Sequence, residues 1–228
     1  MSTALEGTSI FHKVLFPTQK AGGEHTSLTL QRPVGFQVSA TTVTNHVPWV
    51  LFDLETTGLD SSSDRMIEIG AIRVEHGKVV DEFSTLIQSP IPIPLEVQKL
   101  TGIEPSMLEG QPVASDVLPD FLKFIQGSIL VAHNASFDLP FLKNELARIG
   151  VDLSWPAFCT LKMAAHFLHF LPRKNLDTLA EHYELNFEAR HRSIGDVKVT
   201  WGVLQRILSE EANNLTYWKD FTPFTVSA

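Results

Sequence analysis

Apolar and polar residues alternate in a way that predicts several strands before the first long helix. A continuous apolar run leads into an acidic segment at 49–54, and two further strand-like runs follow at 66–74 and 78–87. The link between the last two, at 75–78, is short and contains a glycine, which is typical of a hairpin turn. These three runs predict antiparallel strands.

Helical spacing of apolar residues begins after the proline-rich stretch 90–94. It predicts a short helix, then a helix over 113–125, and after a short buried strand at 129–132 a further helix that starts near 135. Apolar residues over 194–208 predict another long helix. Strands that alternate with helices pair in parallel, so the pattern as a whole predicts an α/β fold.

The first predicted strand carries two carboxylates, Asp53 and Glu55, at the end where it leaves the core. Side chains two residues apart on a strand point to the same face, so the two acids would repel each other unless a cation lay between them. Oxygen ligands suit hard divalent ions, and the pair therefore predicts a Mg²⁺ or Mn²⁺ site. An ordinary solvated strand end is the alternative for this segment alone.

Two later segments supply further candidate ligands. Asp138 falls in the first turn of the helix after strand 129–132, where it could complete a metal site or only interact with the helix dipole. His191 and Asp196 lie at a junction between a loop and a helix, from which both can converge on one point. A lone loop histidine is ordinarily solvated, so this pair is informative only together with the other acids.

The series DxE, NxxxFD and HxxxxD resembles the motifs of the DEDDh (DnaQ-like) family of 3′→5′ exonucleases, which includes the proofreading epsilon subunit of bacterial DNA polymerase III and RNase T. The resemblance covers about residues 48–208 and includes FDLETTGLD, HNASFDLPFL and HRSIGDVKVT. It implies a ribonuclease H-like α/β fold, with a mixed five-stranded sheet flanked by helices. It also implies five catalytic residues: Asp53, Glu55, Asp138, His191 and Asp196.

The resemblance further implies that the four acids hold two Mg²⁺ or Mn²⁺ ions, which can neutralise charge on the attacking and leaving oxygens of a phosphodiester. Asp53 is expected to bridge both ions. Glu55 and Asp196 would hold the ion nearer the attacking water, and Asp138 would support the second. His191 would take a proton from that water, a role that suits its ordinary pKa of about 6.5.

A site for a free 3′ end also needs substrate contacts. The resemblance places some at the terminal nucleotide, some near its base or sugar and some on the adjoining wall, where an aromatic ring can stack on a base. Core packing is the alternative for the leucine at position 54 and for that aromatic residue, and a structural role is the alternative for the histidine. The expected contacts are Leu54, Thr56, Thr57, Leu100, Thr101, His133, Asn134 and Phe137.

The composition changes this interpretation only in part. The chain has 228 residues, of which 43% are hydrophobic, enough for one well-buried domain with appendages. Its formal net charge of −8 is unfavourable for a nucleic-acid partner, but several acids are assigned to metal and a local basic rim is sufficient. Arg192 is expected to contact substrate on this rim, and the other candidates are Arg173, Lys174, Arg190 and Lys198.

The single cysteine, Cys159, excludes an intramolecular disulfide and fits a reducing compartment. No apolar run reaches the roughly 20 residues that span a bilayer, and the amino terminus lacks the features of a signal peptide. We therefore expect a cytoplasmic protein without a membrane partner.

The resemblance divides the chain into three parts. Residues 1–46 are expected to form a small β appendage or a flexible arm, with a strand-like pattern at 26–30; residues 47–211 form the exonuclease domain, and 212–228 a C-terminal tail. The aromatic tail is expected to pack on the domain rather than to dock into a polymerase. Residues 31–36 faintly resemble peptides that bind sliding clamps, but a chance match explains them better, so a clamp contact is not expected.

Three functional hypotheses follow. The first is a metal-dependent 3′→5′ exonuclease that removes nucleoside monophosphates from single-stranded or frayed DNA 3′ ends, as a stand-alone repair enzyme or as a proofreading partner of a DNA polymerase. The second is the same chemistry on RNA ends, as in RNase T and oligoribonuclease. The third, a non-catalytic nucleic-acid-binding module, is disfavoured because all five catalytic positions are filled.

Overall fold

The apolar run that ends in the acid pair forms the central strand, β2 (Trp49–Thr56), of a computed structural model that describes residues 34–227. It pairs antiparallel with β3 (Met66–Glu75), which pairs antiparallel with β4 (Lys78–Leu86). His76 and Gly77 join β3 to β4, and both have positive φ angles, 50° and 76°, as a two-residue hairpin turn requires. The predicted antiparallel strands and their hairpin are confirmed.

The other half of the sheet is parallel. β5 (Ile129–Ala132) pairs with β2, and β7 (Ala157–Cys159) pairs with β5, both in parallel. The resemblance implied five strands, whereas the order β4-β3-β2-β5-β7-β8 contains six. The additional strand, β8 (Thr225–Val226), comes from the C-terminal tail and pairs antiparallel with β7. Two residues are too few to show a period, so the sequence pattern could not reveal this strand.

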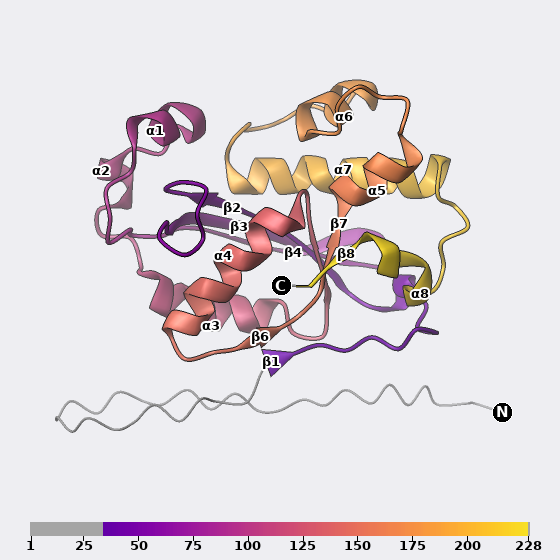
Figure 1. Cartoon of the computed structure of the whole chain (residues 1–228), viewed down its shortest axis with the longest axis horizontal. Helices are drawn as coiled ribbons and strands as arrows, with labels where there is room; N and C mark the ends of the chain where they lie inside the picture. Colours follow the sequence, from indigo (N-terminus) through magenta and orange to yellow (C-terminus); the bar gives the residue numbers. More distant parts are fainter. Residues whose placement is uncertain (1–33, 228) are drawn as a thin grey trace.

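Helices cover both faces of the sheet (Figure 1). The even-numbered residues of β2, from Val50 to Leu54, pack against α3 and α4, while Trp49 and Leu51 face α5 to α7. This alternation follows from the two-residue period of a strand. The predicted mixed α/β architecture is confirmed, and its helices are α1 (Leu95–Thr101), α2 (Pro105–Leu108), α3 (Ala114–Phe124), α4 (Ala135–Arg148), α5 (Thr160–Phe167), α6 (Leu176–His182), α7 (Ser193–Glu210) and α8 (Trp218–Phe221).

Both ends of the described region pack on this framework. β1 (Val34–Gly35) pairs in parallel with β6 (Leu153–Ser154), and the 3₁₀ helix η1 (Thr44–His46) follows it. In the tail, the ring of Phe221 lies 5.5 Å from that of Trp49, and the 3₁₀ helix η2 (Thr222–Phe224) leads into β8. The tail therefore closes one edge of the core.

The strand-like pattern at 26–30 and the first part of the clamp-like peptide at 31–36 lie outside the described residues. Within 34–227, none of the helices combines the length and the apolar character needed to cross a lipid bilayer.

Candidate active site

Three of the predicted carboxylates come together on the α7 side of the sheet. Asp53 and Glu55 are odd-numbered residues of β2, so the strand period directs both toward α7, which carries Asp196 in its first turn. One oxygen of each carboxylate lies within 4.8 Å of the others. Segments more than 140 positions apart in sequence thus contribute to one acidic cluster.

Asp138 approaches the same place from the first turn of α4. Its side chain is only 2% exposed, and its Oδ1 accepts a hydrogen bond of 3.3 Å from the backbone N–H of Leu54, the residue between the two acids of β2. Asp138 is not one of the three carboxylates within 4.8 Å of one another, but its charge raises the pKa of Asp53. It is therefore the fourth acid, beside the cluster.

Two residues of β3 set the position of Asp196. Glu68, opposite Glu55 in the sheet, is 1% exposed, and its Oε2 accepts a 2.9 Å hydrogen bond from the backbone N–H of Ser193 at the start of α7. Gly70 lies under the same turn, where a Cβ atom would be 2.6 Å from the backbone nitrogen of Ile194. Only a residue without a side chain lets the helix start so close to the strand.

Burial of so many acids favours their neutral forms. Burial, with neighbouring carboxylates, raises the pKa of Glu55 to about 8. Burial also raises the pKa of Asp138 to about 8, and that of Asp196 to about 6 against the lowering effect of Arg190. The pKa of Asp53 lies well above its ordinary value, mainly through burial and then through Asp138. Within the described part of the chain, the lowering effect of Arg190 does not offset the burial of these groups.

The cluster has the chemistry of a site for a hard divalent cation. All its donors are carboxylate oxygens, and Oδ1 of Asp196 is buried without a hydrogen-bond partner. A buried carboxylate oxygen without a partner is costly, and a bound cation would satisfy it. Asp53, Glu55 and Asp196 are the residues that could hold such an ion, with Asp138 beside them.

His191 lies on the turn before α7 in a left-handed conformation, with φ of 57°. The ring is half-buried, and burial, together with the charge of Arg190, lowers its pKa. The imidazole is therefore neutral at pH 7 and able to accept a proton.

Arg190 was expected on a basic rim, but its side chain reaches into the acidic cluster. Nη1 donates to Oδ2 of Asp196 at 2.5 Å, while Nε and Nη2 donate to the two carboxylate oxygens of Asp177 on α6 at 2.6 and 3.0 Å. Sequence pattern gave no signal for Asp177, because its partner lies on a different element.

The residues predicted at the terminal nucleotide line the turn after β2. The Leu54 side chain is 4% exposed and belongs to the core, so only its backbone faces the cluster. The hydroxyl of Thr56 donates to the carbonyl of Gly58, and that of Thr57 donates to Asp64. Both threonine hydroxyls therefore shape the turn, and contacts from this segment to a substrate would come chiefly from its backbone.

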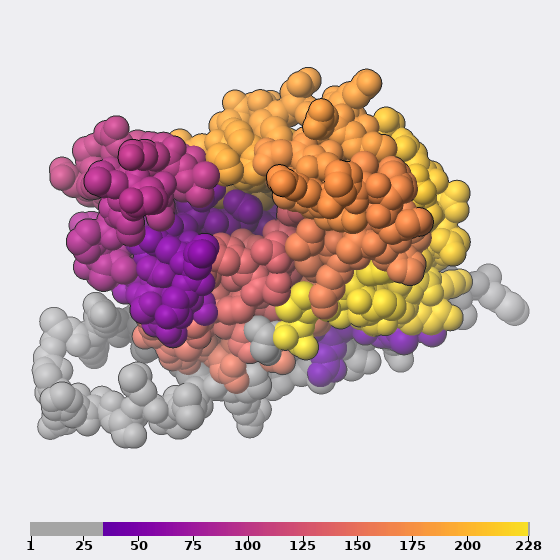
Figure 2. Space-filling view, turned by 45° about the horizontal axis from the view of Figure 1, so that its top comes forward, coloured from indigo at the N-terminus to yellow at the C-terminus, as the bar shows by residue number. Residues whose placement is uncertain are grey.

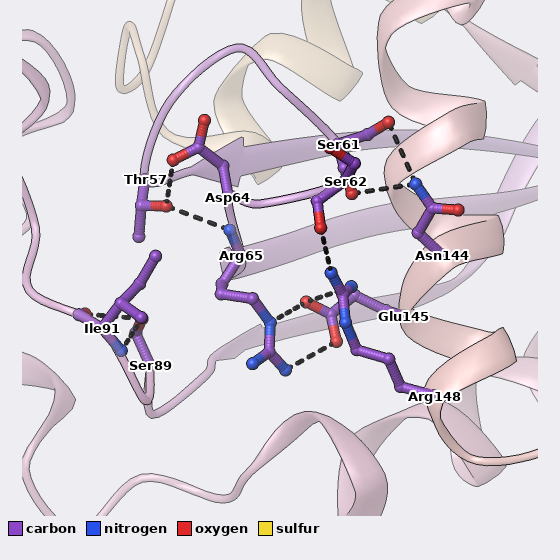
Figure 3. Close-up of polar contacts among 10 residues, drawn as sticks. All are labelled: Thr57, Ser61, Ser62, Asp64, Arg65, Ser89, Ile91, Asn144, Glu145 and Arg148. Atoms are coloured by element: carbon purple, nitrogen blue, oxygen red, sulfur yellow. Dashed lines mark hydrogen bonds and ion pairs between the residues drawn. The ribbon is translucent and has the colours of Figure 1, made fainter.

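The turn is also fastened to α4 (Figure 3). Nε and Nη2 of Arg65 donate to the two carboxylate oxygens of Glu145 at 2.6 and 2.9 Å. Asn144 donates to the carbonyl of Ser61, and Arg148 to that of Ser62. Since Glu145 lies two helical turns after Asp138, this network ties the loop after β2 to the helix that carries the fourth acid.

Figure 2 shows a hollow between two lobes, a magenta one that contains α1 and α2 and an orange one that contains α6. Its floor is formed by indigo residues, which belong to the first part of the described chain. Leu100 on α1 is 57% exposed and free to meet a ligand. Thr101 is 4% exposed, and its hydroxyl donates to the carbonyl of Val97 and accepts from the N–H of Ile103. Of the two, only Leu100 offers an accessible side chain.

The residues predicted on the adjoining wall lie at the junction of β5 and α4. Asn134 precedes α4 with a left-handed φ of 67°, and it accepts a hydrogen bond from Ser136 rather than capping the helix. His133 shares a hydrogen bond with Thr160, and burial lowers its pKa to about 4. Phe137 is half-buried, with its ring 5.0 Å from that of Phe141.

Arg192 has a structural partner. Its Nε and Nη2 donate to Oε1 of Glu68 at 3.0 and 2.6 Å. Sequence reasoning overlooked Glu68, although a charged residue within the apolar strand MIEIGAI was a signal that a buried partner was needed. Lys198, another rim candidate, pairs with Glu82 and Glu188 at the surface.

A cavity of about 600 Å³ lies elsewhere, between η1, the second half of α7 and the C-terminal tail. Trp49, Trp201 and Phe221 are among its lining residues, which include no carboxylate. This cavity therefore lacks the cluster of carboxylates that distinguishes the site between β2 and α7.

Comparison with known proteins agrees with this geometry. The model of the exonuclease family matches residues 50–204. A PolC-type DNA polymerase III from Caldanaerobacter subterraneus subsp. tengcongensis is 40% identical over 162 residues, which cover 71% of this chain and 12% of that protein. The chain thus spans only a small part of the PolC-type relatives that it matches.

A second relative is matched over most of its length. The epsilon subunit of DNA polymerase III from Aquifex aeolicus is 36% identical over 163 residues, which cover 71% of this chain and 81% of the subunit. The structure of exonuclease X in complex with 5′ overhanging duplex DNA superposes with a TM-score of 0.61 at 26% identity, covering 76% of this chain and 98% of that one. The fold is ribonuclease H-like, as the motifs implied, and the chain belongs to the exonuclease family, in its DnaQ-like group.

Proposed function

We propose that this protein is a metal-dependent 3′→5′ exonuclease that removes nucleoside monophosphates from single-stranded or frayed DNA 3′ ends. The observation that carries the proposal is the convergence of Asp53, Glu55 and Asp196 within 4.8 Å, beside the buried Asp138. Four carboxylates gathered in this way need compensating positive charge. A phosphodiester reaction with two divalent ions uses such charge.

The acids would share the work of holding the ions. Two Mg²⁺ or Mn²⁺ ions, when bound, stabilise the charge that develops on the attacking and leaving oxygens of the phosphodiester. Asp53, Glu55 and Asp196 would hold the ions directly, because their carboxylate oxygens converge. Asp138, buried beside them, would complete the set of acids around the ions.

His191 would act as the general base. Its lowered pKa keeps the ring neutral at pH 7, so that it can take a proton from the attacking water. From its position before α7, five residues from Asp196, it would approach the same substrate from the loop side.

The substrate would lie in the hollow of Figure 2. We place the terminal nucleotide against the backbone of Leu54, Thr56 and Thr57. Leu100 would lie near the base or sugar of that nucleotide, with Thr101 buried beneath it as support, and His133, Asn134 and Phe137 would form the adjoining wall. Arg192 would contribute to the phosphate contacts with the outer part of its guanidinium, which stays partly exposed beside Glu68.

DNA is favoured over RNA because the relatives named above belong to DNA polymerase III and because exonuclease X is bound to DNA in its structure. A DNA polymerase is accordingly the partner that we propose, with residues 47–211 as the exonuclease domain. As the partner of a DNA polymerase, the protein would act in the cytoplasm.

The proposal is tested with 3′- and 5′-labelled DNA and RNA oligonucleotides, with Mg²⁺, Mn²⁺ or EDTA. We expect mononucleotides from 3′-labelled DNA, a ladder from 5′-labelled DNA, and no reaction in EDTA. D138A should reduce the rate by roughly a thousandfold, since a ligand beside the ions is lost. D120A, which removes an exposed carboxylate on α3, is the matched control and should remain active.

Activity of D138A equal to that of the parent would refute the assigned site. Faster cleavage of RNA than of DNA would instead change the substrate. Binding of oligonucleotides without any cleavage would support a non-catalytic module.

A further inference from the structure

The position of Arg190 is not explained by the proposed reaction. Its guanidinium bridges α6 and α7 through three hydrogen bonds, two to Asp177 and one to Asp196, and lies 4.9 Å from the centre of the Phe187 ring. Charge-assisted bonds and a stacked aromatic ring together hold an arginine in a defined place. This arginine is therefore an ordered part of the acidic cluster.

The two carboxylate oxygens of Asp196 differ in their surroundings. Its Oδ2 accepts the bond from Arg190 at 2.5 Å, while Oδ1 is buried without a partner and belongs to the carboxylate that converges with Asp53 and Glu55. A guanidinium and a divalent ion next to the same carboxylate repel each other. Binding of one therefore opposes binding of the other.

The charges around the cluster agree with this competition. Arg190 lowers the pKa values of Asp53, Glu55 and Asp196, so its positive charge reaches three of the four acids. Arg192 acts on Glu55 as well, but its fork is occupied by Glu68. Among the described arginines, Arg190 is thus the one that bonds directly to a member of the cluster.

Asp177 provides a second place for the guanidinium. This carboxylate is 54% exposed on α6 and binds Nε and Nη2, which leaves Nη1 as the only nitrogen that contacts Asp196 in the described structure. Loss of the single bond to Asp196 would leave the two bonds to Asp177 intact. The arginine can therefore leave the cluster without leaving the protein.

We propose that Arg190 is an internal counter-cation, which binds Asp196 when no metal is present and is displaced from it, but retained by Asp177, when divalent ions enter. The inference rests on the proposed function and deepens it. Arg190 would stabilise the metal-free protein and lower its affinity for metal, so that binding of the ions is coupled to movement of one side chain.

The test is calorimetric titration of the protein with Mn²⁺ in the absence of DNA. We expect R190Q to bind Mn²⁺ about tenfold more tightly than the parent, because the ion no longer has to displace a charge-assisted bond. R206Q is the matched control. Arg206 lies on α7, pairs with the acid Glu210 and lies over the ring of Tyr183, as Arg190 pairs with acids and lies over Phe187, but it does not contact the cluster. R206Q should bind Mn²⁺ as the parent does.

Thermal unfolding gives a second measurement. In EDTA, R190Q should melt below the parent, and saturating Mn²⁺ should raise its melting temperature by more than it raises that of the parent. R190K keeps the charge but cannot bridge two carboxylates, so its Mn²⁺ affinity should fall between those of the parent and R190Q. If R190Q does not fold in EDTA, the titration of R190K decides.

The outcomes separate this inference from the proposed function. A parent protein that does not bind Mn²⁺ would overturn both. A parent that binds Mn²⁺, with R190Q or R190K binding equally or more weakly, would overturn only the role of Arg190. A raised KM for DNA with unchanged Mn²⁺ affinity would show that Arg190 contacts phosphate instead.

Discussion

Two groups of buried acids lie within the same sheet-and-helix framework, and they differ in the cations that meet them. Glu68 and Glu145 are each 1% exposed, and each accepts two or more hydrogen bonds from an arginine fork. In the active site Asp138 and Asp196 are also buried and Asp53 and Glu55 are half-buried, but within residues 34–227 the four acids receive one direct arginine bond, from Arg190 to Asp196.

The difference shows that burial alone does not mark a functional carboxylate. A buried acid with an arginine partner stabilises the fold by joining two elements, as Glu145 joins α4 to the loop after β2 (Figure 3). A buried acid with a raised pKa and no cationic partner lowers the stability of the folded, metal-free protein. Such a surplus of negative charge is what a bound cation would relieve.

The largest expected effect separates the two groups by activity and stability together. D53N should lower the exonuclease rate by roughly a thousandfold, because a shared metal ligand is lost. The same change should raise the melting temperature in EDTA, since it removes one of several repelling acids. Oligonucleotide cleavage and thermal unfolding measure both, and a D53N protein that is less stable in EDTA would contradict the comparison.

Glu145 should respond in the opposite way. E145Q is expected to lower the free energy of unfolding by about 2 kcal/mol, because Arg65 and Arg148 lose a buried charged partner while remaining partly in water. Urea unfolding measures the change. E210Q, which breaks the exposed pair with Arg206, should cost less than about 0.5 kcal/mol. Equal decreases in the free energy of unfolding of the two variants would show that the network in Figure 3 stabilises the fold no more than an exposed ion pair does.

Glu68 shares features with both groups, because it is paired with Arg192 and also accepts the hydrogen bond that holds the start of α7. E68Q should reduce kcat/KM by about tenfold, through weaker placement of Asp196 rather than loss of a ligand. Mn²⁺ affinity should fall with it. Reduced stability with unchanged Mn²⁺ affinity and activity would leave Glu68 a purely structural residue.

The smallest expected effect is a dependence of stability on pH that is present only without bound metal. The pKa values of Glu55 and Asp138 are raised to about 8, so the folded protein binds more protons than the unfolded chain between about pH 4 and pH 8. Stability in EDTA is therefore greatest at the acid end of this window and declines as pH rises through 8. Saturating Mn²⁺ should abolish the decline. The measurement is the melting temperature between pH 5 and 9, in EDTA and in Mn²⁺. The same pH profile under both conditions would show that the site is misassigned.

Much of this molecule was predictable from local pattern. The hairpin at 75–78 follows from its short link with a glycine, β5 from a short apolar run, and the helices that carry Asp138 and Asp196 from a period of 3.6 residues. All three signals depend only on neighbours in sequence. Asp53 and Glu55 were recognisable by their spacing, and Asp138 and Asp196 by the resemblance of their motifs to those of the exonuclease family. The roles of Thr56 and Thr57 were less accessible, because the partners of their hydroxyls depend on the path of the turn.

The sequence by itself determined which elements form and which residue types could hold a cation, because strand and helix periods and the chemistry of carboxylates are local properties. Only the tertiary structure decided which acids converge, that Arg190 points into them, that Glu68 and Gly70 position α7, and that the tail adds a sixth strand. These depend on distances between segments far apart in the chain, and such distances are set by the packing of the whole core.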